Sequence, residues 1–147
     1  MILLLVTKAV NNSNTANCIL LNAQSLGNKL PELHCLLYSF CYQIILITES
    51  WFDSTFTNGL LDPASRYIIF RKDRNRNGGG VCAFVDREFI VSEVCLNSCP
   101  SYLEMLCFDI IHQCRPMSVC VCYRPSGYSP ECVNIITKMI DCLCVWH

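Results

Sequence analysis

The sequence has no apolar run long enough to span a membrane and nothing typical of a secretion signal, so we expect neither an anchor nor a leader. A membrane-spanning helix needs about 20 mostly apolar residues, and the opening run MILLLV is far shorter. That run also lacks the basic start and the small-residue cleavage site of a signal peptide. We therefore expect no membrane partner, and we interpret residues 1–17 as an N-terminal extension, either an added strand or a ragged start.

An excess of charge is missing as well. The chain has 11 Lys and Arg against 12 Asp and Glu. A net charge of −1 does not point to any particular class of binding partner. Its 147 residues suit a single domain. However, 52% of them are hydrophobic and the mean hydropathy is +0.34, which is high for a complete soluble domain. We therefore expect apolar faces that require a partner.

Cysteine is abundant, but the spacings that would give it a function are absent. The 13 cysteines are scattered through apolar runs, with no C-x-x-C pair and no Cys/His group at zinc spacing. We interpret them as small buried hydrophobes in a reducing compartment, and so expect an intracellular protein, nuclear or cytoplasmic. The competing interpretation is a secreted disulfide framework.

The first part of the chain predicts a βαβ unit. CILL at 18–21 and QIILIT at 43–48 have the composition of buried strands. Between them, residues 28–41 predict a helix with Pro31 in its first turn. The apolar residues spaced for one face of this helix are Leu33, Leu36, Leu37 and Phe40. Strands joined by a helix in this way are expected to be parallel.

The pattern then changes to short strand-like runs separated by polar or Gly/Pro breaks, which predicts an antiparallel meander. The runs are RYIIF, GVCAFV, FIVSEVCL, LEMLCFDII and MSVCVCY. Residues 129–143 return to helical spacing, with Ser129 as a natural N-cap and Pro130 behind it. No repeat, low-complexity tract or linker interrupts the chain.

Two polar residues occupy equivalent places in the βαβ unit. Asn22 follows the first strand and Glu49 follows the second. The carboxyl ends of parallel strands meet at the sheet edge where α/β proteins bind ligands. A carboxylate at the mouth of an apolar strand is costly unless a partner meets it. An amide and a carboxylate together suit Mg²⁺; the alternative is a capping Asn and a surface Glu.

Two other segments carry groups that suit phosphate. Residues 66–80 hold five of the eleven basic residues, one Asp and three glycines, a composition that suits a phosphate backbone or a solvated hairpin loop. Asp73 is expected to orient the arginines. In YRPSG, Tyr123 and Arg124 can bind phosphate oxygens or mark an ordinary strand-to-turn junction. The basic residues that we assign to DNA phosphate are Arg71, Lys72, Arg74, Arg76 and Arg124.

Together these segments resemble the endonuclease domain of non-LTR (LINE-type, CR1-like) retrotransposons. That domain belongs to the endonuclease/exonuclease/phosphatase superfamily, with the apurinic endonucleases and DNase I. The resemblance is carried, in order, by LLNAQSLGNKLPEL, IILITESWFD, IFRKDRNRNGGGVC and VCYRPSGY. It implies an α/β fold, the N-terminal portion of a four-layer α/β/β/α DNase I-like sandwich over residues 18–147.

The resemblance also implies roles for single residues. Glu49 would be the principal ligand of one catalytic Mg²⁺ or Mn²⁺, Asn22 a metal-site residue that orients phosphate, and Tyr123 the neighbour of the scissile phosphate. Arg124 would contact phosphate or be structural, and Gln24 stands where relatives often have Arg. The implied substrate is DNA, the implied reaction is metal-assisted phosphodiester hydrolysis, and the implied partner in an intact element is a downstream reverse transcriptase.

Two motifs of that family are missing. No G-D-x-N segment occurs and no His follows an Asp, so the groups that position and activate water are not in this sequence. The chain thus resembles an N-terminal half-domain, and we expect it to be inactive. Most of the second sheet would be encoded downstream. We therefore expect the isolated chain to aggregate, to dimerise through an uncovered sheet face, or to remain loosely packed.

Two other functions stay open. The first is a non-catalytic nucleic-acid-binding remnant that uses the basic segment 66–80. The second is a phosphoesterase of the same superfamily that acts on small substrates. The E-S-W and R-K-D-R-N-R signatures favour the retrotransposon branch over the second.

Overall fold

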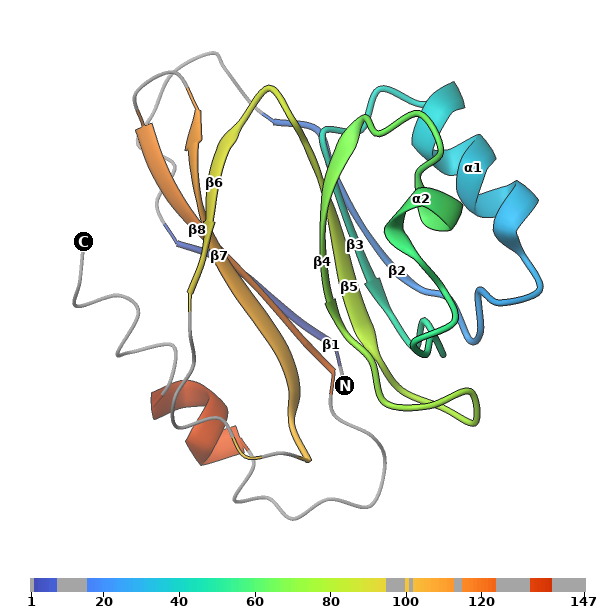
Figure 1. Cartoon of the computed structure of the whole chain (residues 1–147). Coiled ribbons are helices and arrows are strands. Elements are labelled where there is room, and N and C mark those ends of the chain that lie inside the picture. Colours follow the sequence, from blue (N-terminus) through green and yellow to red (C-terminus); the bar gives the residue numbers. More distant parts are fainter. Residues whose placement is uncertain are drawn as a thin grey trace.

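The computed structural model describes residues 2–7, 16–94, 100, 102–112, 115–123 and 133–138. In this part of the chain the strands form two four-stranded sheets that face each other (Figure 1). The first sheet has the order β2-β3-β5-β4, with β2 (Cys18–Asn22), β3 (Ile44–Thr48), β4 (Tyr67–Lys72) and β5 (Val81–Asp86). The second has the order β1-β8-β7-β6, with β1 (Ile2–Thr7), β6 (Ile90–Glu93), β7 (Glu104–His112) and β8 (Arg115–Tyr123). The fold is mixed α/β.

The predicted βαβ unit is confirmed. β2 and β3 pair in parallel, so that Asn22 lies opposite Thr48, and α1 (Leu30–Ser39) connects them. Helix α1 is shorter than the predicted span because Phe40 takes an extended conformation and ends it. The assignment of Phe40 to the apolar face is wrong, since this residue is 50% exposed.

The predicted antiparallel strands are also confirmed, but they do not belong to one sheet. β4 pairs with β5 in the first sheet, whereas β6, β7 and β8 pair in the second. The short turn after β5 carries the chain from one sheet to the other. The predicted meander is therefore divided between the two sheets.

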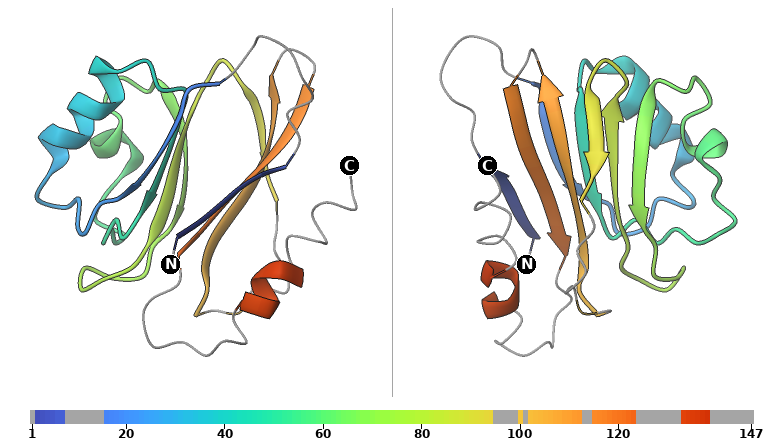
Figure 2. Two further views of the ribbon diagram at one scale, coloured as in Figure 1. Left: turned by 180° about the vertical axis from the view of Figure 1, so that it is seen from behind. Right: turned by 60° about the vertical axis from the view of Figure 1, so that its left-hand side comes forward.

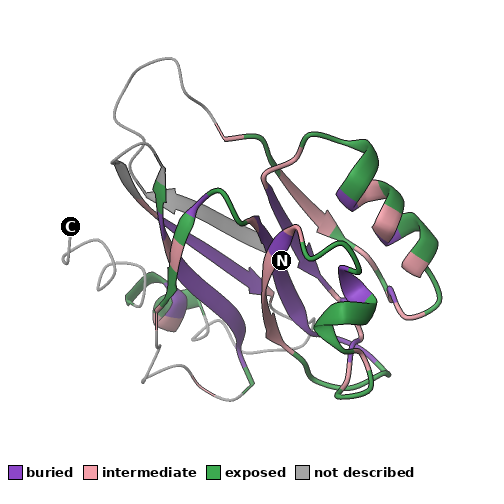
Figure 3. Ribbon diagram, turned by 45° about the horizontal axis from the view of Figure 1, so that its top comes forward, coloured by how far each residue is buried: buried purple, intermediate pink, exposed green. Residues whose placement is uncertain are grey.

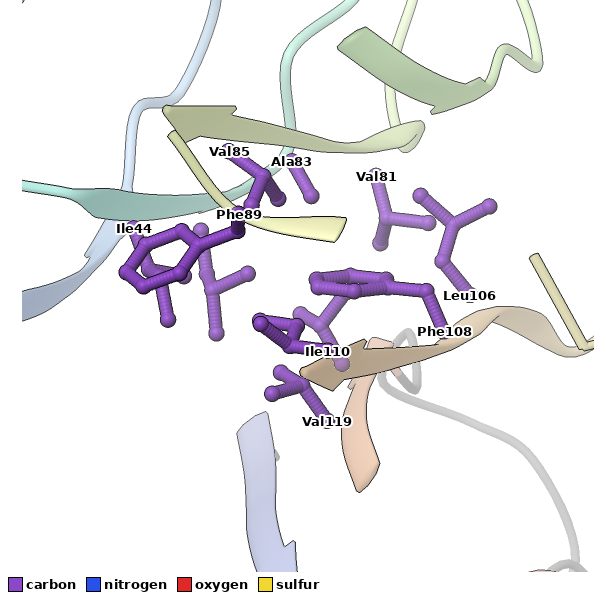
Figure 4. Packing of buried hydrophobic residues seen from close by; sticks show 11 residues of the cluster. Ile44, Val81, Ala83, Val85, Phe89, Leu106, Phe108, Ile110 and Val119 are labelled. Carbon is purple, nitrogen blue, oxygen red and sulfur yellow. The ribbon is translucent and has the colours of Figure 1, made fainter. Parts of the chain in front are cut away.

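The main core lies between the sheets (Figure 4). Side chains alternate along a strand, so β5 directs Val81, Ala83 and Val85 inward while β7 directs Leu106, Phe108 and Ile110 toward them. Phe108 stacks on Phe70 of β4 with ring centroids 5.0 Å apart. This contact joins the two sheets directly.

Helices cover the outer faces (Figure 2). Helix α1 and the short α2 (Asn58–Leu61) lie on the first sheet, where Leu33 and Leu37 are fully buried against its outer side. Residues 133–138, part of the predicted C-terminal helix, bury Ile136 against the outer side of the second sheet. Figure 3 shows buried strands between mostly exposed helical surfaces.

The expectation that the chain supplies little of the second sheet is wrong. Strands β6, β7 and β8 form three of its members, and the N-terminal extension adds β1 antiparallel to β8. The inner face of the first sheet is therefore covered by the chain itself. Self-association was expected because of an uncovered sheet face, and the described strands cover that face. Self-association therefore stays a prediction without this support.

The cysteines are distributed over both environments. Those described are free; Cys82, Cys107, Cys120 and Cys122 are buried, as expected, whereas Cys18, Cys35 and Cys41 are exposed. Within the described ranges, no helix is both long and apolar enough to cross a membrane.

Candidate functional site

Three of the predicted site residues meet at one edge of the molecule. The Asn22 amide Nδ2 donates to Glu49 Oε1 at 3.1 Å, and the Tyr123 hydroxyl donates a short hydrogen bond to the same oxygen. Asn22 ends β2 and Glu49 directly follows β3 in the first sheet, while Tyr123 ends β8 of the second. The expected proximity is confirmed, and the site spans both sheets.

The backbone on both sides of this edge adopts a conformation that is unusual for residues other than glycine. Glu49 and Trp51 have positive φ values of 54° and 56°, and Gln24 and Ser25, after β2, have 45° and 80°. Non-glycine residues adopt this region rarely, and such residues cluster at functional sites. The two strand ends therefore share an unusual geometry that the sequence did not reveal.

Hydrogen bonds on both sides hold the strained segment. Ser25 N donates to the Glu49 carbonyl at 3.0 Å, which ties the segment to the loop after β2. On the other side, Ser50 N donates to Gly80 O at 3.2 Å and Trp51 N to Gly79 O at 3.0 Å. Glu49 is thus held between two loops by backbone contacts.

The glycine run is required by this close approach. Gly79 and Gly80 have φ values of +73° and +84°, which favour glycine. A Cβ atom on Gly80 would lie 2.6 Å from Ser50 Oγ, and one on Gly79 would lie 2.3 Å from Glu104 Oε1. The interpretation of these glycines as allowing close approach and unusual φ/ψ is confirmed.

Electrostatics favour the ionised form of Glu49. The hydrogen bond from Tyr123 is the main cause that lowers the pKa of Glu49, with Asn22 and the charge of Arg74 acting in the same direction against burial. The Trp51 indole also helps to lower this pKa, although its buried Nε1 makes no hydrogen bond of good geometry. Burial, and then the contact with Glu49, raises the pKa of Tyr123 to about 12.

A second carboxylate at the site was missed by sequence reasoning. Glu104 opens β7 directly opposite Tyr123 and is only 4% exposed. Its Oε2 accepts from Gly80 N at 2.7 Å, and its Oε1 lies 3.2 Å from Arg74 Nη1. Burial raises its pKa. The signal was available, because period two places Glu104 on the inward face with Leu106.

The donor set fits a weakly chelated hard cation. Both hydrogen bonds fall on Glu49 Oε1, and no described hydrogen bond engages Oε2. Mg²⁺ often takes only one or two carboxylates, with waters and phosphate oxygens completing the shell. Asn22 uses its amide nitrogen on Glu49 and its Oδ1 as acceptor from Gln24 N at 3.3 Å, which is the geometry of an orienting residue. In the described residues no three His, Cys, Asp or Glu side chains gather as a metal cluster.

Most cations of the segment 66–80 already have partners. Arg71 pairs with Asp73, as expected, and is only 13% exposed. Lys72 Nζ donates to the Leu103 carbonyl at 2.9 Å. Arg76 pairs with Asp53 but is 60% exposed. The other pairs are Arg66 with Asp86 and Arg74 with Glu104.

The segment is therefore less positive than its composition indicates. Arg71 is held in place by carbonyls of the loop after β3 as well as by Asp73, so its role is structural as much as electrostatic. Arg74 and Arg76 are the cations of the segment that keep the most exposed surface, at 40% and 60%. Arg124, the remaining predicted phosphate contact, lies outside the described residues.

Comparisons with known proteins add no family to this geometry. No protein-family model matches the chain, and no curated protein matches it either. The functional argument therefore depends on the sequence segments and on the arrangement of these side chains.

Proposed function

We propose that the chain carries the metal- and phosphate-binding part of a DNase I-like endonuclease site of the non-LTR retrotransposon type. In this proposal it binds DNA together with Mg²⁺ or Mn²⁺ but does not hydrolyse it. The observation that carries the proposal is the Glu49 carboxylate, which Asn22 and Tyr123 orient from two sheets through its Oε1, with no hydrogen bond from the described residues recorded on its Oε2. Two facing sheets with helices outside support the finer fold assignment.

Each residue has a defined task in this proposal. Glu49 supplies an ionised oxygen to the cation, and Asn22 fixes the rotation of that carboxylate. Tyr123 donates to Glu49 and stands where a phosphate oxygen could replace that acceptor. A bound cation would neutralise charge on the phosphate and on the leaving oxygen.

Water activation is the step that this chain is not equipped to perform. The sequence contains neither a G-D-x-N segment nor an Asp-His pair. In the part of the chain that the structure describes, no hydrogen bond links a histidine to Asn22, Glu49 or Tyr123. General-base activation is worth about 10²–10⁴-fold in rate, so we expect binding without turnover.

Cation binding is the first test. Mn²⁺ is titrated into the protein and free Mn²⁺ is followed by electron paramagnetic resonance. We expect one site in the wild type that is lost in Glu49→Gln, which keeps the side-chain shape. Glu88→Gln is the matched control, because this exposed carboxylate follows β5 at the opposite end of the same sheet and should leave the site intact. Equal binding by both variants would refute the metal site.

Nicking of supercoiled plasmid in Mg²⁺ is the second test. We expect the wild type to nick no faster than Glu49→Ala. Metal-dependent nicking that Glu49→Ala abolishes would support the site and would show that the expected inactivity is wrong.

The competing function, nucleic-acid binding by the basic segment 66–80, is less favoured because its cations are paired. It makes a different prediction. DNA binding that survives EDTA and Glu49→Gln but is lost in an Arg74→Ala, Arg76→Ala double variant would favour this segment over the cation site.

A further inference from the structure

The two sheets are tied by polar contacts at the same edge as the candidate site. Glu104 belongs to the second sheet, yet its Oε2 accepts from Gly80 N of the first sheet at 2.7 Å. Through the carbonyls of Gly79 and Gly80, the same loop holds the backbone of Ser50 and Trp51. A continuous series of hydrogen bonds thus runs from Glu104 to the residue next to Glu49.

Glu104 also holds Arg74 beside the site. The carboxylate lies 3.2 Å from Arg74 Nη1, and Arg74 Nε donates to Gly78 O at 2.9 Å. The guanidinium is near enough to Glu49 for its charge to favour the ionised carboxylate. One buried carboxylate therefore fixes both the glycine loop and the nearest cation.

A second observation marks this spot as more than ordinary packing. In the described residues, the buried side-chain polar atoms without a hydrogen bond of good geometry are Ser50 Oγ, Trp51 Nε1 and Glu104 Oε1, although Glu104 Oε1 keeps its ion pair with Arg74 and the Trp51 indole lies near enough to Glu49 to lower its pKa. Such atoms are rare in native structures, and each requires an explanation. Ser50 Oγ and Glu104 Oε1 border the loop of Gly79 and Gly80, and the backbone of Trp51 is hydrogen-bonded to it, so this close approach leaves the Ser50 hydroxyl without a hydrogen bond.

We propose that Glu104 is a positioning residue: its carboxylate fixes the Gly79–Gly80 loop and Arg74, and through them the Glu49 segment that presents the candidate cation ligand. This inference depends on the proposed function for its purpose, but not for its geometry. Reach matters more than charge for this role. Reach allows the Gly80 amide and Arg74 to be held together, and charge pairs with the guanidinium.

Two substitutions separate reach from charge. Glu104→Asp keeps the charge but is one methylene shorter, so it should not reach Gly80 N and Arg74 together. Glu104→Gln keeps the length and an acceptor for Gly80 N but loses the ion pair. Glu88→Gln serves again as the matched control on the opposite end of the sheet.

The readout in metal-free protein is amide hydrogen exchange by NMR at Ser50 and Trp51, with Ala83 in the centre of β5 as the internal reference. We expect Glu104→Asp to reduce protection at Ser50 and Trp51 at least tenfold while Ala83 is unchanged. Glu104→Gln should keep protection within about threefold. Retained protection in Glu104→Asp, or loss in Glu104→Gln with retention in Glu104→Asp, would overturn the proposal.

Mn²⁺ affinity links the positioning role to the site. Residues that orient a ligand typically change metal affinity by about 10–100-fold, so Glu104→Asp should bind Mn²⁺ at least tenfold more weakly than Glu104→Gln. If the wild type binds no Mn²⁺ through Glu49, the proposed function fails while hydrogen exchange still decides the role of Glu104. A Glu104→Asp variant that exchanges locally but binds Mn²⁺ as the wild type does would overturn the positioning role.

Gly79→Ala tests the same contact with Glu104 intact, and it replaces Glu104→Asp if that variant does not fold. The added Cβ would lie 2.3 Å from Glu104 Oε1 and 2.6 Å from Arg74 Nε. It should therefore reproduce the local loss of protection at Ser50 and Trp51. A Gly79→Ala protein that keeps both amides protected would overturn the inference.

Discussion

Removal of the Phe108 ring should test whether the two sheets close a core of their own. Phe108 is fully buried on β7 and stacks on Phe70 of β4, with centroids 5.0 Å apart and planes 10° apart. Truncation of a buried Phe to Ala costs about 3–5 kcal/mol, because transfer free energy is lost and a cavity remains. Native domains are stable by only about 5–15 kcal/mol in total, so Phe108→Ala should lose a large share.

The assay is urea and thermal unfolding followed by circular dichroism. For a chain of this size, 1 kcal/mol corresponds to about 2–4 °C in Tm, so Phe108→Ala should unfold on the order of 10 °C lower. The matched control is Phe40→Ala, since Phe40 is 50% exposed beyond α1 and exposed substitutions stay within about 0.5 kcal/mol.

Equal losses in the two variants would refute the packed two-sheet core. A wild type that binds a hydrophobic dye strongly and unfolds without cooperativity would refute it as well, and would restore the expectation of an uncovered sheet face. A cooperative transition that Phe108→Ala lowers would instead mean that the described strands bury their own inner faces.

The remaining predictions concern the site. Gly80→Ala should destabilise the protein by at least about 1–2 kcal/mol from the left-handed backbone alone, with a further cost from the approach to Ser50 Oγ at 2.6 Å; Gly59→Ala, with nothing within 4 Å, should be neutral or stabilising in the same thermal scan. Tyr123→Phe should raise the pKa of Glu49, because the main cause that lowers this pKa is removed. A carboxyl group whose pKa is lowered by folding stabilises the folded state at pH values above its unfolded pKa of about 4.3. This stabilisation is lost as the pH falls through the folded pKa, so the wild type should be more stable than Tyr123→Phe at pH 6. The gap should narrow in unfolding measured toward pH 3, and a constant gap would contradict this role of Tyr123.

The residue positions that could be predicted correctly from the sequence are those that follow from local patterns. The parallel pairing of β2 and β3 follows from a strand, a helix and a strand in succession, and it brings Asn22 beside Glu49. The positive φ of Glu49 does not follow from any local rule. It requires the Gly79–Gly80 loop on one side and the loop after β2 on the other, and these contacts come from distant parts of the chain.

The errors have the same physical origin. Strand-like runs reveal that strands exist, but not which sheet each one joins, so the crossing between β5 and β6 could not be predicted. The pairing of Arg76 with Asp53 likewise joins residues that no pattern connects. Glu104 differs from these cases, because the alternation of side chains along β7 predicts that it faces the core on the same side as Leu106 and Phe108. A charge on a core face should have been considered as a site residue.

The polar contacts between the sheets lie at one edge of the apolar core, which explains how the Glu49 carboxylate can lie at the end of an apolar strand. Between the sheets the described core is apolar and includes the fully buried Phe108. At one edge, Tyr123 meets Glu49, Glu104 meets Gly80, and Lys72 meets the Leu103 carbonyl, and each contact joins the two sides of the sandwich. Buried polar groups are stabilised only when paired, so these contacts require one fixed position of the two sheets relative to each other. The same position brings Glu49 and Tyr123 together, and the candidate site therefore exists only while the two sheets are packed.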